Sequence, residues 1–99
     1  MTNNITDLRI AMLRDKLSKA LAPSFLDIID EGWQHIGHAE EGSGHFAVRI
    51  ASPCFIEEDP ERRKKNKSLL ECHRLVYSAL GSIVGTEIHA LRIEIIPAD

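Results

Sequence analysis

Histidine and cysteine have the most versatile chemistry in this 99-residue chain, and their spacing limits what they can do. The chain holds five histidines and two cysteines: His35, His38, His45, His73, His89, Cys54 and Cys72. Imidazole and thiolate are common ligands of zinc and of iron–sulfur clusters. No HExxH, HxH or CxxC motif occurs, so we expect no autonomous zinc site.

Cys72 and His73 are adjacent, but they do not form a catalytic pair. Neighbouring residues of a helix point about 100° apart, so the imidazole would not face the thiol. The sequence also lacks a P-loop, a GxGxxG fingerprint and a GxSxG elbow, and no acid–base pair can be assigned. We therefore expect a buried or half-buried helical cysteine and a chain that is not an enzyme.

Each histidine considered alone is more often a packing or surface residue than a ligand. His73 is expected at the interface between a helix and the sheet, and His45 has the same default role. His38 lies in a glycine-rich connection, where a metal could reach its ring. His89 lies in the last predicted strand, on the side of Leu91 and Ile93, where a polar ring needs a partner or a function.

Charge is distributed unevenly along the chain. Residues 62–67 (RRKKNK) hold five of the 12 basic residues. The rest of the chain has seven basic and 15 acidic residues. An acidic run, Glu57, Glu58, Asp59 and Glu61, precedes this basic block. A charge run of this kind is usually a solvated loop or helix start, and contact with nucleic acid is the rarer alternative.

Length and hydropathy predict a single domain without a membrane segment. Ninety-nine residues accommodate one hydrophobic core and not two. The longest apolar runs are too short to cross a bilayer, and the first residues have no basic and apolar signal pattern. Two cysteines also exclude a disulfide-rich scaffold. We expect a cytoplasmic protein.

Hydrophobic periodicity predicts two helices. The first follows Thr6 and Asp7 and ends before Pro23, with its apolar stripe at Leu8, Met12, Leu13, Leu17, Ala20 and Leu21. The second runs from about Glu61 to Ile83 or Val84, with Gly85 after its end. Its apolar face is predicted at Leu69, Leu70, His73, Val76, Leu80 and Ile83.

Three segments have the composition of strands, namely residues 24–31, 45–52 and 87–96. The first two flank the glycine-rich connection 32–44 and suggest an antiparallel hairpin. The predicted order is therefore α-β-β-α-β. Two amphipathic helices packed on one face of a three-stranded sheet make a two-layer α+β domain.

Several short motifs in register resemble the BolA family. They are Cys72 to Leu80 (CHRLVYSAL), Ile88 to Leu91 (IHAL), Gly37 to Ala39 (GHA), Gly44 to Phe46 (GHF) and Ala51 to Phe55 (ASPCF). The resemblance extends from about residue 6 to residue 96. It implies an α-β-β-α-β fold similar to class II KH domains, as one domain over residues 1–99 with a charged insertion at about 57–67.

The resemblance implies a non-enzymatic partner of monothiol glutaredoxins. In such complexes a 2Fe–2S cluster is shared between the glutaredoxin's cysteine with glutathione and ligands from the BolA protein. The C-terminal histidine of the family corresponds to His89. The second ligand comes from the loop between the first two strands, where GHA matches the histidine type and selects His38, with His35 and His45 as rivals. The isolated chain would hold no cluster and would be a monomer or a weak homodimer.

The chain departs from the family pattern near the second helix. Cys72 replaces the first arginine of a usual Arg-His-Arg, the segment Phe55 to Glu57 lacks the glycine of Phe-x-Gly, and the insertion lengthens the connection. These differences leave His38 and His89 unaffected. The alternative function is a DNA-binding regulator of transcription in morphology or stress response, which the KH-like fold permits although no Gly-x-x-Gly clamp is present.

Overall fold

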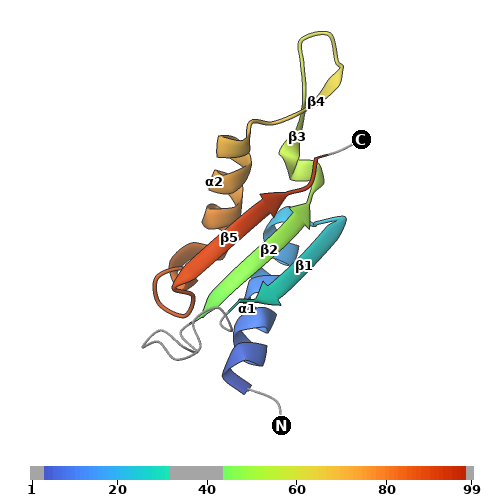
Figure 1. The fold of residues 1–99 in the computed structure, drawn as a ribbon. Helices are drawn as coiled ribbons and strands as arrows, with labels where there is room; N and C mark the ends of the chain where they lie inside the picture. The colour runs from blue at the N-terminus through green and yellow to red at the C-terminus, as the bar shows by residue number, and fades with distance from the viewer. Residues whose placement is uncertain (1–3, 32–43, 98–99) are drawn as a thin grey trace.

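A computed structural model describes the fold over residues 4–31 and 44–97. Its main sheet has the strand order β1-β2-β5, formed by β1 (Phe25–Asp30), β2 (His45–Ala51) and β5 (Ala90–Ile95). β1 pairs antiparallel with β2, and β2 pairs parallel with β5. Both helices, α1 (Asn4–Leu21) and α2 (Leu69–Leu80), lie on one side of this sheet (Figure 1). The predicted two-layer α+β architecture and the hairpin of the first two strands are confirmed.

The core lies between the sheet and the helices. Phe46, Val48 and Ile50 are almost fully buried, while Arg49 between them is exposed on the opposite face, because successive strand side chains alternate. The helices contribute Leu13, Leu17, Leu21, Cys72, Val76 and Leu80 to the same cluster. The other sheet face carries exposed charged side chains such as Arg49, Arg92 and Glu94, and neither of the two described helices covers it (Figure 1).

α1 begins at Asn4, earlier than the predicted caps Thr6 and Asp7, and ends before Pro23 as predicted. The predicted stripe was too wide, because Leu8 is 63% exposed and Ala20 is also exposed. Leu13, Leu17 and Leu21 form the buried part. Leu8 lies on the first turns of the helix, whose N-terminal end extends past the sheet (Figure 1).

The prediction of a helix from Glu61 was wrong. Residues 56–66 form a β-hairpin of β3 (Ile56–Glu58) and β4 (Lys64–Asn66), which projects beyond the end of the main sheet (Figure 1). A short 3₁₀ turn, η2 (Pro53–Phe55), connects β2 to this hairpin. The structure therefore contains two strands, β3 and β4, that the predicted α-β-β-α-β order lacks.

α2 starts only at Leu69, because Ser68 is its N-cap. The Ser68 hydroxyl oxygen accepts a hydrogen bond from the Glu71 N–H over 3.1 Å, the capping arrangement typical of an S-x-x-E sequence. Leu69 and Leu70, predicted on the core face, are 67% and 60% exposed. They occupy the first turn of the helix.

α2 also ends earlier than predicted. Gly81, with a φ of 62°, follows the last helical residue, and its N–H bonds to the Tyr77 carbonyl. A 3₁₀ turn, η3 (Gly81–Ile83), comes next. Gly85, which was predicted as the helix stop, has a φ of 99° in the following turn. Glycine adopts these positive φ angles without the steric cost that other residues incur.

Candidate functional site

The starts of β2 and β5 lie side by side, because the two strands are parallel and His45 is paired with Ala90. The N–H groups of His89 and Ala90 both donate to the Gly44 carbonyl oxygen, over 2.9 and 3.2 Å. His89 therefore lies one residue before β5 and not within it, which corrects the predicted strand 87–96. Its side chain is exposed, so it is not a polar ring held on an apolar face.

Gly44 is required at this contact for a steric reason. It is buried with a φ of +85°, and a Cβ at this position would lie 2.7 Å from the carbonyl oxygen of Glu87. Real Cβ atoms essentially never approach backbone oxygen so closely. Only glycine allows the turn that carries Glu87 and His89 to pack against the start of β2.

Both ends of the segment 32–43 are hydrogen-bonded at the start of β2, and the Gly44 end contacts His89. On one side, Gly44 binds the His89 N–H. On the other, the Glu31 N–H donates to the His45 carbonyl oxygen over 2.7 Å. His38 and His35 fall in this segment and lie outside the described residues. His45 is described, half-buried at the first position of β2.

Ion pairs connect the elements that surround this end of the sheet. The Arg92 guanidinium donates to both Glu31 carboxylate oxygens, over 2.6 and 3.2 Å, and so joins β5 to the end of β1. This bonding holds the pKa of Glu31 below its usual value, although burial acts in the opposite direction. From the helix layer, Arg9 Nε lies 4.0 Å from Glu87 Oε2.

The described residues do not form a complete metal site. Over residues 4–31 and 44–97, no group of three or more His, Cys, Asp or Glu side chains is placed to hold a metal ion. A site at His89 would need ligands from residues 32–43, from a partner, or from both. Of the predicted ligands, the structure thus places His89 and the rival His45 near each other along the sheet.

Of the two cysteines, Cys72 is packed away from solvent and Cys54 is partly accessible. Cys72 is 1% exposed, as expected, and burial is the main cause that raises the pKa of its thiol. A protonated, buried thiol is a poor nucleophile. His73 is half-buried on the same helix, and Cys54 is half-buried next to η2.

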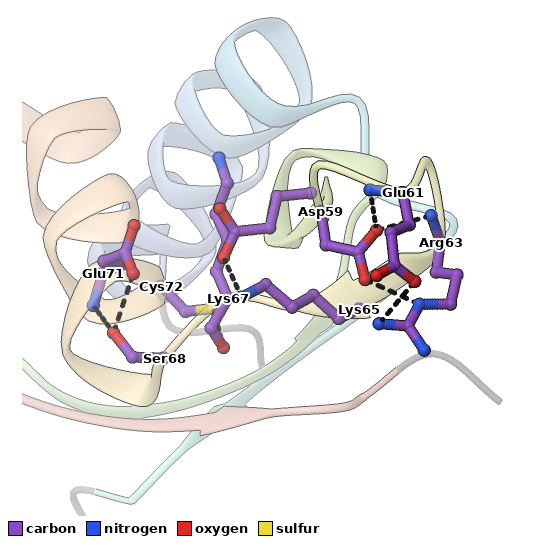
Figure 2. Close-up of polar contacts among 9 residues, drawn as sticks. Asp59, Glu61, Arg63, Lys65, Lys67, Ser68, Glu71 and Cys72 are labelled. Carbon is purple, nitrogen blue, oxygen red and sulfur yellow. Dashed lines mark hydrogen bonds and ion pairs between the residues drawn. The ribbon is translucent and has the colours of Figure 1, made fainter.

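The basic block 62–67 lies on and next to the hairpin, and the acidic run pairs with three of its five basic side chains. Lys64 pairs with Glu58 and Lys65 with Glu57, at N–O distances of 4.0 and 3.9 Å. Figure 2 shows the Arg63 guanidinium between two carboxylates; its Nε is 2.8 Å from Asp59 Oδ2, and its Nη2 is 3.2 Å from Glu61 Oε2. These pairs, two across the strands and two in the turn between them, form an ion-pair ladder that reduces the positive charge the block presents.

Sequence reasoning missed three contributors to the site. Gly44 carried a usable signal, because a glycine directly before a strand often marks a close backbone approach. Glu31 and Arg92 are separated by 61 positions and had no such signal, since the strand order that brings β1, β2 and β5 together was not predicted.

Comparisons with known proteins agree on one family. A family model described as BolA-like protein matches residues 17–99. The chain is 37% identical over 90 residues to Protein BOLA1, chloroplastic, of Arabidopsis thaliana. This alignment covers 86% of this chain and 51% of that protein. It is 34% identical over 79 residues to the DNA-binding transcriptional regulator BolA of Escherichia coli K12, covering 80% of this chain and 66% of that protein.

Solved structures give the same result. BolA1 from Arabidopsis thaliana has a TM-score of 0.66 at 35% identity, over 96% of this chain and 92% of that one. The BolA domain of SufE1 from the same plant has a TM-score of 0.67 at 35% identity, over 86% of each chain. The chain spans 21% and 51% of the full length of the SufE-like and BOLA1 relatives. Among the described residues, no helix is long and apolar enough to cross a membrane.

Proposed function

Because the chain belongs to the BolA-like protein family, whose members are not enzymes, we propose that it is an adaptor that binds a monothiol glutaredoxin. The two proteins share a 2Fe–2S cluster, held by the glutaredoxin's cysteine with glutathione and by His89 and His38 of this chain. The complex acts in iron–sulfur cluster trafficking or in iron and redox regulation.

The observation that carries this proposal is the placement of His89. Its side chain is exposed, while its backbone N–H is bonded to the buried Gly44. A ligand that must meet a partner's cluster needs an accessible ring on a positioned backbone, and His89 combines an exposed side chain with a hydrogen-bonded backbone N–H. The ion pairs of Arg9 with Glu87 and of Arg92 with Glu31 hold the surrounding elements together.

His38 is the proposed second ligand because its GHA motif matches the histidine type of the family and because its segment ends at Gly44, which contacts His89. The segment 32–43 leaves from Glu31 and returns at Gly44, and both anchors are hydrogen-bonded at the start of β2 or β5. His35 is in the same segment, and His45 follows it directly. These two histidines are the alternatives that the experiment must separate from His38.

The donor set fits a shared cluster. Two neutral imidazoles are too few to hold a 2Fe–2S cluster, which takes four ligands, whereas a partner that adds thiolates completes the set. Replacing thiolates by imidazoles reduces the negative charge around the irons and raises the reduction potential. The residues of this chain would thus bind the cluster from one side and set part of its potential.

Co-expression with a monothiol glutaredoxin tests the proposal. We expect a coloured heterodimer that contains iron and sulfide and whose visible circular dichroism differs from that of the glutaredoxin homodimer. His89→Ala and His38→Ala should each alter that spectrum, while His35→Ala, His45→Ala and the helix variant His73→Ala should leave it unchanged. A spectrum that survives His89→Ala would remove His89 from the ligand set, and the absence of any complex would refute the adaptor function.

DNA binding is the second candidate, and its support is the name of the Escherichia coli relative. The ion-pair ladder of the hairpin counts against the basic block as the contact surface. A phosphate-binding surface would give an affinity that falls steeply with added salt. Binding lost when Arg62, Arg63, Lys64, Lys65 and Lys67 are neutralised would support this candidate, and no binding at low salt would refute it.

A cytoplasmic location is also part of this proposal. One Arabidopsis relative has a chloroplast location in its name, and the other is named for chloroplasts and mitochondria. Fractionation of cells that express the chain with a detectable tag decides between these compartments.

A further inference from the structure

The outer side of β5 is an unused strand edge. β5 is the last strand in the order β1-β2-β5, so β2 occupies one side of it, and among the described residues no strand pairs with the other side. An edge of this kind presents a row of backbone N–H and C=O groups that can pair with another strand.

The hydrogen bonds between β5 and β2 show which backbone groups of β5 point away from β2. The N–H groups of Ala90 and Ile96 donate to β2 or its flanking residue, at the Gly44 and Ile50 carbonyls. Since a strand directs the backbone groups of alternate residues to alternate sides, the even-numbered residues of β5 bond to β2. The N–H and C=O groups of Leu91, Ile93 and Ile95 therefore face the free edge.

The side chains of β5 divide by the same alternation. Leu91, Ile93 and Ile95 are partly buried against the core on the helix side. Arg92 and Glu94 are exposed on the opposite face. There Arg92 pairs with Glu31 at 2.6 Å, and Glu94 pairs with Arg49 at 3.1 Å.

We propose that two copies of the chain pair antiparallel through their β5 edges, with Ile93 on the two-fold axis. Ile93 would then exchange both backbone hydrogen bonds with Ile93 of the partner subunit, and Leu91 would do so with the partner's Ile95. The two sheets become one continuous sheet. A self-complementary contact of this kind is the normal geometry of a two-fold dimer.

Charge selects this register among those that the backbone allows. Pairing about Ile93 puts Arg92 directly opposite the partner's Glu94, and the same contact is repeated on the other side of the axis. These are non-hydrogen-bonded pairs, in which the side chains come closest. A shift by one step in either direction would put Arg92 opposite the partner's Arg92 or Glu94 opposite the partner's Glu94, which is destabilising.

The proposed contact also extends interactions that the monomer already has. On the open face, Glu31 pairs with Arg92 and Glu94 pairs with Arg49, so the dimer would place these pairs in one row of alternating charge. The other sheet edge has no such possibility. β1 carries Asp27 and Asp30 but no basic residue, so two β1 edges cannot pair opposite charges.

A charge-swap series tests the dimer without relying on the glutaredoxin proposal. Sedimentation equilibrium should detect a monomer–dimer equilibrium for the wild type. Arg92→Glu and Glu94→Arg should each weaken it roughly tenfold or more, since both symmetric pairs become repulsive. The double variant R92E/E94R should recover the wild-type dissociation constant, because opposite charges again face each other across the axis.

The double variant separates the dimer contact from effects within one chain. Inside one chain it makes both the pair with Glu31 and the pair with Arg49 repulsive, so a purely intramolecular effect would be largest in the double variant. Recovery therefore supports the contact across the axis. A wild type that stays monomeric up to millimolar concentration, or a double variant no better than the single ones, would overturn the proposal.

Disulfide formation tests the register directly. Residues opposite each other in a non-hydrogen-bonded pair have Cα atoms about 4.5 Å apart, within the range that a disulfide bridges. A mixture of Arg92→Cys and Glu94→Cys chains should oxidise to a covalent heterodimer. Either variant alone, and the wild type with its native Cys54 and Cys72, should form much less. Equal crosslinking in all four samples would refute the register.

Discussion

The backbone N–H of His89 donates to the carbonyl oxygen of Gly44 over 2.9 Å. The residue that carries this exposed imidazole directly precedes β5, and its backbone is thus bonded to a buried residue that directly precedes β2. Gly44 directly follows the segment 32–43, which contains His38, so the same backbone contact positions His89 and holds the residue at which that segment ends. The position of His89 therefore depends on this glycine.

Gly44→Ala should destabilise the protein and impair the site. A Cβ would lie 2.7 Å from the Glu87 carbonyl oxygen, and the residue has a φ of +85°. We expect a loss of about 1–3 kcal/mol in the free energy of unfolding, measured by urea denaturation. Iron and sulfide retained with a co-expressed glutaredoxin should fall as well.

Gly85→Ala is the matched control for this prediction. Gly85 has a φ of +99° but nothing within 4 Å of its ideal Cβ position, so it shares the backbone strain and lacks the collision. The difference between the two variants measures the close approach to Glu87. Equal losses would show that the contact between Gly44 and Glu87 is unimportant.

Glu31→Gln should change the acid sensitivity of the fold. Arg92 holds the pKa of Glu31 below its usual value through its hydrogen bonds. A carboxylate whose pKa is lower in the folded than in the unfolded state adds stability above the unfolded pKa. That stability is lost as the pH falls through the folded pKa.

The variant should therefore lose up to about 1 kcal/mol at neutral pH, the range of an exposed ion pair. Below the folded pKa of Glu31 it should be as stable as the wild type. Urea titrations of dilute protein at several pH values measure this. Arg92→Gln should remove the same pH-dependent part, and a wild-type pH profile in either variant would contradict the assignment to this pair.

Local patterns predict most of the main sheet and its helices. The spacing of Leu13, Leu17 and Leu21 predicts the buried stripe of α1, and the alternation of Phe46, Val48 and Ile50 predicts β2. These residues lie on single elements, so their periodicity reports directly which face is buried. The strand order is different, because β2 and β5 pair only after the chain has passed through α2.

The region 56–68 shows where periodicity misleads. It is an acidic run followed by a basic run with few apolar residues, so it has no hydrophobic period of its own, and the helical pattern that is real after Leu69 was extended backwards through it. The hairpin is instead stabilised by ion pairs between opposite strands, such as Lys65 with Glu57. The S-x-x-E sequence from Ser68 to Glu71 was the signal that could have placed the start of α2 correctly.

The candidate site was predictable only as residue types. Histidines at positions 38 and 89 could be chosen from the motifs around them, whereas the ion pair of Glu31 with Arg92 crosses three strands. A contact of that kind requires the tertiary topology. The exposure of His89 likewise follows from the turn before β5, which the predicted strand 87–96 did not contain.

Asp59→Ala should loosen the hairpin while leaving the main sheet intact. One Asp59 carboxylate oxygen accepts the N–H groups of Glu61 and Arg63 over 2.9 and 2.8 Å, and the other accepts from the Arg63 side chain (Figure 2). We expect faster amide hydrogen exchange over residues 56–66. Exchange in β1, β2 and β5 should stay unchanged, because the hairpin is a separate two-stranded sheet.

Asp59→Asn separates the two roles of this carboxylate. An amide oxygen can still accept the two backbone N–H groups but carries no charge for the Arg63 guanidinium. We expect exchange rates between those of the wild type and Asp59→Ala. Protection equal to that of Asp59→Ala would mean that the charge, and not the turn hydrogen bonds, maintains the hairpin.

Ser52→Ala should be the most destabilising of these polar substitutions, because Ser52 is buried and connects α1 to β2. Its hydroxyl donates to the carbonyl oxygen of Leu21, the last residue of α1, and accepts the Cys54 N–H over 3.0 Å. Carbonyls at a helix C-terminus lack intrahelical partners, so the substitution leaves a buried acceptor with only the weak contact of the Cys54 thiol at 3.7 Å. We expect a loss of about 1–3 kcal/mol in the free energy of unfolding, measured by chemical denaturation.

Ser24→Ala is the control, because it removes an exposed hydroxyl 3.4 Å from the Ala51 carbonyl oxygen. It should lower the free energy of unfolding by less than about 0.5 kcal/mol. Similar losses for the two variants would contradict this role of Ser52.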